Sequence, residues 1–262
     1  MRGMLANLRV FLQFDNWPTL LLNRVFDRET GLVVYRKGGL EILIDHRGGD
    51  QNGTRACLTT DMYKRYLPKI DRGGPRRVLD LGSNGGGFPL MLRLAKVDLA
   101  QVVCVEMNRP TWLRLLVNPA TNMGDKATGL NAAVSGMPAD SEILLEPSRG
   151  GTGLSVDRNR ADSSAPHVAV RTTTLEALYE QYFKGYDIDI CKIDIEGAEY
   201  EVLGSSSDRV LEKIRNLIIE FHDPGQTPAC VSRLLGLGFT EITDRSNAAT
   251  GETTEVRAFS RE

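Results

Sequence analysis

The stretch at residues 78–88, VLDLGSNGGGF, constrains the fold more than any other part of the chain. Its apolar first half predicts a short buried strand, its middle is a glycine-rich turn, and the apolar residues after Gly86 predict a helix. Glycine has no Cβ and tolerates positive φ, as asparagine also does, so backbone N–H groups in such a turn can approach a ligand closely. We interpret the turn as a cofactor site, and we expect a side chain added at Gly82 to occupy space that the ligand needs.

The spacing of the glycines distinguishes between cofactors. A dinucleotide-binding Gly-x-Gly-x-x-Gly motif requires a glycine where this chain has Asn84. The pattern instead resembles motif I of the class I S-adenosylmethionine (SAM) methyltransferases, Asp-x-Gly-x-(Gly/Asn)-x-Gly. On that resemblance, the residues of the turn that bind the cofactor are Asp80, Gly82, Ser83, Asn84 and Gly86.

Two later strand ends supply further candidates for cofactor binding. Residues 101–106 predict a strand that ends on Glu106, where such folds place a ribose-binding carboxylate; a solvated acid at a strand end is the alternative. Residues 127–134 predict a third strand. Asn131 and Ala132 lie near its end, where such folds contact adenine, and simple packing of the strand terminus is the alternative.

Composition bears on partners and location. The 262 residues carry a net charge of −2 with 25% charged residues, which predicts no broad basic surface and does not favour nucleic acid as a partner. The four cysteines are scattered without a Cys-x-x-Cys pair, which favours free thiols in a reducing compartment and hence a cytoplasmic location. Charged residues interrupt the apolar runs near the N-terminus, so we expect no transmembrane segment and no signal peptide.

Residues 1–74 are predicted to form an N-terminal cap or extension ahead of a SAM-dependent methyltransferase domain at 75–262. Helical spacing before residue 26, a hairpin at 32–35 and 40–45, and a helix at 61–67 are its predicted elements. We interpret it as a cap over the acceptor site or a homodimer surface, with a helix on a membrane surface as a third alternative. A chain beginning near residue 72 is expected to bind SAM but to lose acceptor turnover.

The alternation of strands and helices is interrupted around residues 135–172, which we interpret as an insertion at the rim of the site. Residues 142–146 and 167–171 predict strands on either side of a loop rich in glycine, serine and arginine. In this loop Arg149, Arg158 and Arg160 are candidates for contacting an anionic or sugar-like substrate, with solvated loop charges as the alternative.

A second informative run, residues 188–199, reads IDICKIDIEGAE. Its first half alternates as a strand and its second half begins a helix, which places Asp194 at the carboxyl end of the strand. Residues 216–222 repeat this design, with Glu220 and His222 on one face at the corresponding end. Because the carboxyl ends of parallel strands meet at one edge of a sheet, we expect these three side chains to converge near the transferred methyl group.

Together these motifs resemble one family. The pattern of FkbM-type methyltransferases is matched in order, over roughly residues 75–243, by DLGSNG from Asp80, NAAV from Asn131, TLE from Thr174, KIDIEGAE from Lys192 and IIEFH from Ile218. The family often has Glu-Pro-x-Pro where this chain reads EMNRP from Glu106. The resemblance implies an α/β fold with a doubly wound, mostly parallel, seven-stranded Rossmann-like sheet in the order 3-2-1-4-5-7-6, preceded by a helical and hairpin extension. It also implies a SAM-dependent O-methyltransferase acting on a hydroxyl of a small molecule, sugar or natural product.

The predicted catalytic residues are Asp194, Glu220 and His222. An alcohol is a poor nucleophile near neutral pH and needs a general base or a metal that lowers its pKa. If a metal is present, the same three residues are its ligands and Mg²⁺ is the candidate; without one, His222 takes the proton and Glu220 orients the imidazole. Lys192 is a third candidate, as a base with a lowered pKa, against the alternative of a structural ion pair with Asp194.

Two other classes of function remain open. An NAD-dependent oxidoreductase would share the sheet and the ribose acid, although its fingerprint is broken at Asn84. A non-catalytic SAM-binding protein would keep the glycine-rich turn and need no acids at the other strand ends. Separate titrations with SAM and NAD discriminate the first, and binding without turnover identifies the second.

Overall fold

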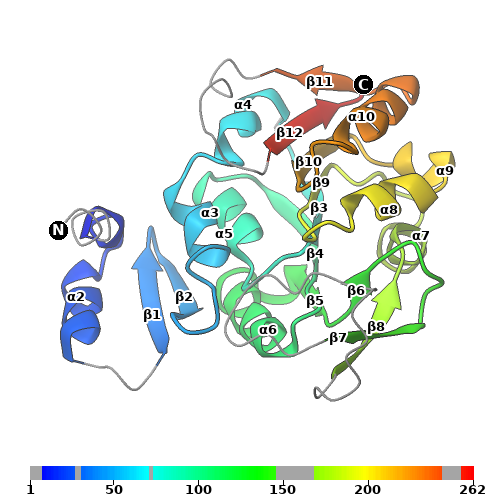
Figure 1. The fold of residues 1–262 in the computed structure, drawn as a ribbon. Coiled ribbons are helices and arrows are strands. Elements are labelled where there is room, and N and C mark those ends of the chain that lie inside the picture. Colours follow the sequence, from blue (N-terminus) through cyan, green and yellow to red (C-terminus); the bar gives the residue numbers. More distant parts are fainter. Residues whose placement is uncertain (1–7, 27–30, 71–72, 146–167, 244–254) are drawn as a thin grey trace.

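The computed structural model describes residues 8–26, 31–70, 73–145, 168–243 and 255–262 (Figure 1). Arg149, Arg158 and Arg160, the candidates for substrate contact at the rim, lie outside the described residues. Of the helices in the described part of the chain, none has the length and hydrophobicity that crossing a bilayer requires.

A seven-stranded sheet forms the centre of the molecule. Its strands, from one edge to the other, are β11 (Thr240–Ile242), β12 (Glu255–Ser260), β10 (Asn216–Phe221), β9 (Ile190–Ile193), β3 (Arg76–Leu81), β4 (Leu99–Val105) and β5 (Ala127–Leu130). β12 runs antiparallel to β10 and β11 on either side of it, and the other neighbouring strands pair in parallel. Counted along the chain this is the order 3-2-1-4-5-7-6, so the predicted fold class is confirmed. The winding reverses between β3 and β9, and their carboxyl ends open the crevice in which ligands of such sheets bind.

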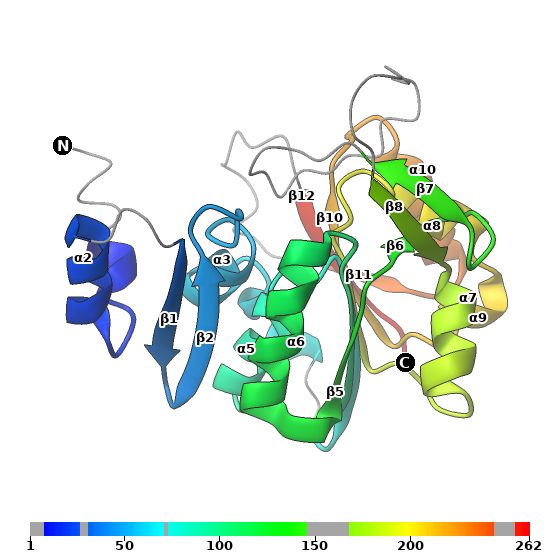
Figure 2. The same cartoon turned by 90° about the horizontal axis from the view of Figure 1, so that it is seen from below.

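Helices cover both faces of the sheet (Figure 2). One face carries α5 (Gly87–Leu94) and α6 (Arg109–Met123), which a 3-10 turn (Gly124–Lys126) follows. The opposite face carries α7 (Leu175–Leu178) with a π-helical turn (Tyr179–Phe183), α8 (Glu199–Ser205), α9 (Asp208–Leu211) and α10 (Thr227–Gly236). Pro119 lies inside α6, and the helix continues past it to Met123. The hairpin strand β2 packs against this helix.

The N-terminal segment packs outside α5 and α6. Outermost is α2 (Trp17–Phe26), followed by the hairpin of β1 (Leu32–Lys37) and β2 (Leu40–Asp45) and then by α3 (Thr54–Thr59), which lies against α5 (Figure 2). The hairpin is as predicted. The helix predicted at 61–67 is wrong in its extent: a 3-10 turn (Lys64–Tyr66) precedes α4 (Leu67–Ile70). Pro68 lies in the first turn of α4, where its missing N–H costs no hydrogen bond.

One hydrophobic core joins the N-terminal segment to the sheet. Phe14, Tyr35 and Ile42 belong to the same buried cluster as Phe88 of α5 and Val102 of β4. A boundary at residue 74 therefore does not divide the core, and a capping function for residues 1–74 stays a prediction. On the outer helix α2, Trp17, Leu22 and Phe26 are exposed; the homodimer and membrane-surface alternatives also stay predictions.

A separate three-stranded sheet accounts for the interruption of the alternation. It consists of β6 (Ala133–Val134), β8 (Val168–Thr173) and β7 (Glu142–Leu145), with β8 in the middle. The strand predicted at 142–146 is found as β7, one residue shorter, and the strand predicted at 167–171 is found as β8, which begins one residue later and ends two residues later. Thr174 then caps α7, its hydroxyl accepting a hydrogen bond from the N–H of Ala177.

Candidate active site

A cavity of about 580 Å³ opens at the carboxyl ends of β3, β9 and β10. This volume lies within the range of about 300–1,000 Å³ that is usual for ligand sites. Its walls also include parts of residues 52–63, from the N-terminal segment. We call one group of lining residues the turn end, namely Gly82, Ser83, Asn84, Glu106 and Ala132, and another the acid end, namely Tyr63, Asp194, Glu220 and His222.

Contacts within the protein require a glycine at position 82. Its φ is +73°, and a Cβ built there would lie 1.6 Å from the backbone carbonyl oxygen of Asp194. The first turn residue thus touches the end of the neighbouring strand β9. This corrects the expectation that a side chain at Gly82 would meet the ligand: it would first meet the protein backbone.

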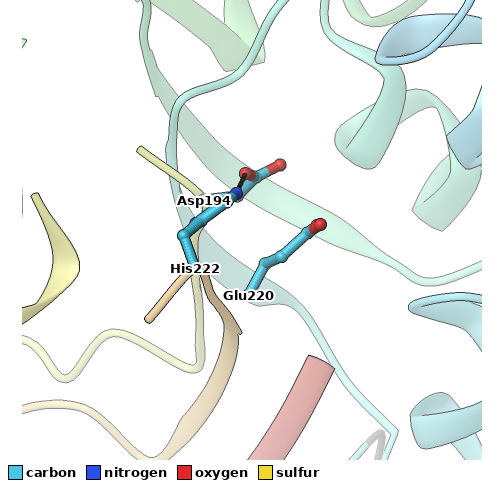
Figure 3. A group of neighbouring side chains, drawn as sticks. All are labelled: Asp194, Glu220 and His222. Carbon is cyan, nitrogen blue, oxygen red and sulfur yellow. Dashed lines mark ion pairs between the residues drawn. The ribbon is translucent and has the colours of Figure 1, made fainter. Parts of the chain in front are cut away.

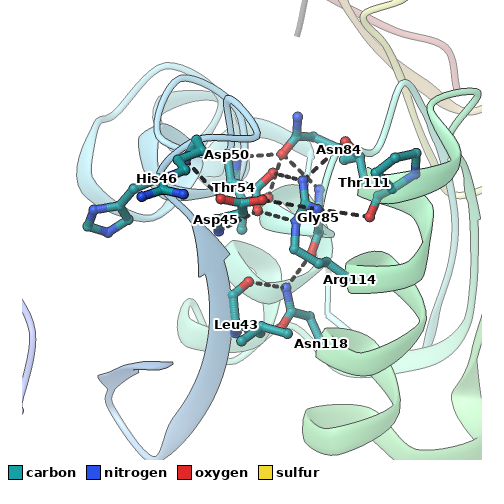
Figure 4. A network of polar contacts seen from close by, with 12 residues as sticks. Leu43, Asp45, His46, Asp50, Thr54, Asn84, Gly85, Thr111, Arg114 and Asn118 are labelled. Carbon is teal, nitrogen blue, oxygen red and sulfur yellow. Dashed lines mark hydrogen bonds and ion pairs between the residues drawn. The ribbon is translucent and has the colours of Figure 1, made fainter. Parts of the chain in front are cut away.

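Asn84 is held in the left-handed conformation, with φ +49°, by contacts from two segments (Figure 4). Its side-chain Oδ1 accepts hydrogen bonds from Thr54 Oγ1 at 2.8 Å and from the backbone N–H of Gly85 at 2.8 Å. Asn118 of α6 donates from Nδ2 to the carbonyl oxygens of Gly85, at 2.8 Å, and Leu43, at 3.0 Å. Residues of α3, the hairpin and α6 therefore hold the turn together.

A buried ion pair fixes the loop that leads to Thr54 (Figure 4). Arg114 of α6 donates to the Asp50 carboxylate from Nε at 2.6 Å and from Nη2 at 2.8 Å. Asp50 is completely buried and also accepts from the N–H of Asp45 at 2.8 Å. Such bidentate, charge-assisted pairs are geometrically specific, and loss of one partner leaves a buried charge. The pair therefore ties the N-terminal segment to α6 beside the turn.

Glu106 presents a carboxylate that the backbone holds from behind. Oε2 accepts from the N–H of Asn84 at 2.9 Å, and Oε1 accepts from the N–H of Asn108 at 2.7 Å. Burial raises the pKa of Glu106 to about 7, against the opposing effect of these two backbone donors. A carboxylate has about four lone-pair sites, so acceptor capacity remains for two hydroxyl groups of a ligand.

Three residues predicted to bind the cofactor do not line the cavity. Asp80 is completely buried below the turn, because it ends in the interior of the sheet beside Lys192. Gly86, with φ +87°, is the N-cap of α5. Asn131 donates from Nδ2 to the carbonyl oxygens of Glu106, at 2.9 Å, and Met107, at 3.0 Å. These three shape the turn end from outside, whereas the remaining predicted residues face the cavity.

Lys192 joins the two ends of the cavity. Its Nζ lies 3.3 Å from Asp80 Oδ1 and 3.3 Å from Asp194 Oδ2, and it donates to the carbonyl oxygen of Gly82 at 2.8 Å. Burial alone would lower the pKa of Lys192, but the carboxylates of Asp80 and Asp194 outweigh burial and raise it. The hypothesis of a base with a lowered pKa is therefore wrong, and Lys192 forms a structural ion pair.

Asp194, Glu220 and His222 come together at the ends of β9 and β10 (Figure 3). One ligand atom from each lies within 4.8 Å of the other two, and all three residues line the cavity. Two carboxylates and an imidazole at this separation can hold a divalent cation. The structure thus brings together the three residues predicted as catalytic, while their roles stay predictions.

Glu199 orients His222. Its Oε1 lies 3.0 Å from His222 Nδ1, while His222 Nε2 is 3.6 Å from Glu196 Oε2 and 3.9 Å from Asp194 Oδ1. Burial alone would lower the pKa of His222, but the bond to Glu199 and the surrounding carboxylates raise it to about 9. Glu220 was predicted for the orienting role; Glu199 holds it because the N–H groups of Ile195 and Gly197 fix its carboxylate in place.

Sequence analysis misses Tyr63 completely. Its hydroxyl lies 3.0 Å from Asp194 Oδ2 and 2.9 Å from Glu220 Oε2. A single tyrosine outside any motif carries no sequence signal. Glu196 and Glu199 are not among the predicted site residues, but they do carry a sequence signal, because both lie in the KIDIEGAE run.

Comparison with known families matches residues 95–259 to the Methyltransferase FkbM domain. No curated protein matches the chain. Among solved structures it is similar to Trm5b from Pyrococcus abyssi, with a TM-score of 0.50 and 12% identity over 89% of this chain and 56% of that chain. It is also similar to methyltransferase FkbM from Methylobacillus flagellatus KT, with a TM-score of 0.47 and 14% identity over 79% of this chain and 53% of that chain. A METTL16 MTase domain gives a TM-score of 0.42 and 14% identity over 75% of this chain and 65% of that chain.

The chain thus spans less than two thirds of the length of each of these three structures, and at such identities the likeness to Trm5b shows the fold alone. The family match is more informative. It covers more than half of the 262 residues and includes Glu106, Asp194, Glu220 and His222. The chain therefore belongs to the FkbM family of SAM-dependent methyltransferases.

Proposed function

We propose that this protein is an O-methyltransferase that transfers the methyl group of SAM to a hydroxyl of a small molecule, sugar or natural product. The observation that carries the proposal is that one cavity contains both the turn end and the acid end. Methyl transfer is an in-line displacement, so donor and acceptor have to lie in one space with the reacting atoms aligned. Residues 52–63 form part of the wall, which supports the proposal that the N-terminal segment caps the acceptor.

The turn end fits SAM by its donor and acceptor chemistry. The Glu106 carboxylate has free acceptor capacity for the two ribose hydroxyls, and Ala132 offers an apolar contact for adenine. SAM supplies a methyl group on a positively charged sulfonium. The carboxylates of Asp194 and Glu220 favour a cation in the same cavity, because opposite charges attract strongly where water is excluded.

The acid end supplies what an alcohol needs in order to react. The bond to Glu199 and the nearby carboxylates raise the pKa of His222 to about 9, which favours the protonated imidazole near neutral pH and argues against His222 as the group that takes the proton. The carboxylates of Asp194 and Glu220 are then the groups that orient the acceptor hydroxyl and take its proton. The second form of the proposal is a divalent cation such as Mg²⁺, which the same three residues would hold and which would lower the pKa of the hydroxyl.

The alternatives differ in what they need from the chain. Membership of a methyltransferase family argues against the NAD-dependent oxidoreductase. A non-catalytic SAM-binding protein would not need acids converging on the cavity.

All four cysteines are free thiols, which supports the proposal of a reducing, cytoplasmic location.

The test is transfer of a radiolabelled methyl group from SAM to a panel of hydroxylated acceptors, preceded by separate calorimetric titrations with SAM and NAD. Asp194→Asn, Glu220→Gln and His222→Ala are assayed with and without chelator, and Glu212→Gln, on the exposed surface, is the control. Loss on chelation that Mg²⁺ restores supports the cation. Chelator-resistant activity that Asp194→Asn or Glu220→Gln abolishes supports the carboxylates. Binding of SAM without transfer to any acceptor contradicts the proposal.

A further inference from the structure

We propose that Tyr63, from the N-terminal segment, is a positioning residue for methyl transfer that holds the carboxylates of Asp194 and Glu220 side by side. The kinetic part of this inference rests on the proposed function. Residue 63 lies before the residues matched to the family, 95–259, so the segment adds a component to the acid end that the matched part of the chain does not contain.

The hydroxyl of Tyr63 links the ends of two strands. Asp194 follows β9 and Glu220 belongs to β10, and the hydroxyl lies within hydrogen-bond distance of both, at 3.0 and 2.9 Å. Its single proton can be donated to either carboxylate in turn. Without this link, the two neighbouring carboxylates repel each other. Lys192 still holds Asp194 at 3.3 Å, so Glu220 has more to gain from rotating toward water. The Tyr63 hydroxyl therefore holds the two carboxylates next to each other, one on each strand end.

The ring of Tyr63 is fixed as firmly as its hydroxyl. Tyr63 is 3% exposed, and its ring packs edge-on against Phe88 with centroids 5.6 Å apart and an interplanar angle of 88°. Phe88 lies in the first turn of α5, directly after the glycine-rich turn. The Nζ atom of Lys192 lies 5.7 Å from the centroid of the same ring. A ring held in this way loses little further freedom when its hydroxyl binds the acids, so the contact can position them at low entropic cost.

Tyr63 thereby connects the two ends of the cavity through one side chain. Its ring contacts the helix that begins at the turn end, and its hydroxyl contacts Asp194 and Glu220 at the acid end. This contact gives the N-terminal segment a defined task beyond covering the cavity. The expected consequence is that loss of the hydroxyl impairs the methyl-transfer step and leaves cofactor binding intact.

The test is Tyr63→Phe, which keeps the ring on Phe88 and removes only the hydroxyl. We expect kcat to fall at least 10-fold at saturating SAM and acceptor, while the Kd for SAM stays within twofold of the wild type. Tyr66→Phe is the matched control, because the buried hydroxyl of Tyr66 donates to the Val256 carbonyl oxygen at 2.8 Å and does not face the cavity. It should lower Tm and leave kcat unchanged. An unchanged kcat in Tyr63→Phe overturns the inference.

A crystal structure of Tyr63→Phe gives a readout that does not depend on an acceptor. The expected result is that Asp194 or Glu220 adopts a different rotamer from the wild type, whereas Tyr66→Phe leaves both unchanged. If the wild type transfers no methyl group to any acceptor, the proposed function fails but this comparison still tests the inference. Identical carboxylate positions in Tyr63→Phe and the wild type overturn it. Tyr63→Leu, which removes the ring as well, should both weaken the packing on Phe88 and displace the acids.

Discussion

At the turn end of the cavity, polar side chains hold backbone groups in a special conformation, whereas at the acid end ionisable side chains hold one another. Gly82 and Asn84 have positive φ and are held by neighbouring carbonyl and hydroxyl groups, and Glu106 is itself fixed by two backbone N–H groups. Asp194, Glu220 and His222 are instead held by other side chains. Space and backbone conformation thus limit what the turn end tolerates, while charge and hydrogen bonding limit the acid end.

The difference predicts two kinds of failure. Added atoms at the turn end should unfold or distort the protein, because a carbonyl oxygen or a helix already occupies the space. Conservative changes at the acid end should leave the fold intact and remove activity, because the side chains there are partly exposed to the cavity. Glu106 is the exception that makes the comparison testable, since it is a charged side chain at the turn end.

The largest effect is expected from removing residues 1–72. This deletes Thr54 and Tyr63 and a large part of the continuous core, so a chain beginning at residue 73 should neither fold cooperatively nor bind SAM. The contacts thus predict the opposite of the sequence-based expectation that such a chain binds SAM. A chain beginning at residue 31 lacks only α2 and the residues around it, and α2 does not line the cavity. We expect this chain to bind SAM, and its Tm to be lower than that of the wild type. Thermal melts and calorimetry measure both; wild-type SAM affinity in the shorter chain would show that the turn holds its own shape.

Gly82→Ala should have the second-largest effect, and this effect is on the stability of the fold. The Cβ overlaps the carbonyl oxygen of Asp194 at 1.6 Å and the residue keeps a positive φ, so β9 or the turn has to move. We expect a loss of at least about 3 kcal/mol in the free energy of unfolding. Gly204→Ala in α8 is the control, because nothing lies within 4 Å of its Cβ and alanine favours the helix by about 0.5–1 kcal/mol. Equal stability of the two variants, measured by urea unfolding, would show that the turn is not limited by space.

Glu106→Gln should weaken SAM binding about 5- to 150-fold, or about 1–3 kcal/mol, without a large change in stability. In the glutamine the side-chain NH₂ would face a backbone N–H that now donates to a carboxylate oxygen. The side chain would therefore lose one acceptor for the ribose hydroxyls. Because the pKa of Glu106 is raised to about 7, SAM affinity of the wild type should rise from about pH 6 to about pH 8 as the carboxylate ionises. The contribution of Glu106 to stability has the opposite sign: it is fully present below about pH 4.5 and lost as the pH rises through about 7. Calorimetry across this range checks both, and a pH-dependent affinity in Glu106→Gln would assign the effect to another group.

Thr54→Val should have the smallest effect. It keeps the volume of a buried side chain and removes only the hydroxyl that donates to Asn84 Oδ1, while the Gly85 N–H still donates there. We expect a loss of about 1 kcal/mol in SAM binding, or roughly fivefold in Kd. Thr59→Val, at the other end of α3, removes a hydroxyl that bonds only within the helix and should leave the Kd unchanged. A larger change in Thr59→Val than in Thr54→Val would contradict the role of Thr54 at the turn.

Much of the fold follows from patterns that are local in the sequence. The glycine-rich turn, the strands that end at Glu106 and Asp194, and the hairpin all follow from periodicity and turn chemistry. The partners of the functional side chains do not. The role of Glu199 at His222 and that of Tyr63 at Asp194 depend on residues far apart in the chain, and no spacing rule connects them.

Features that depend on residues close together in the sequence could be predicted, whereas features that depend on residues far apart could not. The doubly wound sheet and the arrival of Asp194, Glu220 and His222 at one edge were predictable, because parallel strands have to present their carboxyl ends together. The folded chain alone showed that Gly82 makes room for β9, that Lys192 is an ion-pair partner, and that the N-terminal segment completes both ends of the cavity. These features are set by burial and by contacts across the core, which determine the pKa of a lysine or the space beside a glycine and which leave no periodic trace in the sequence.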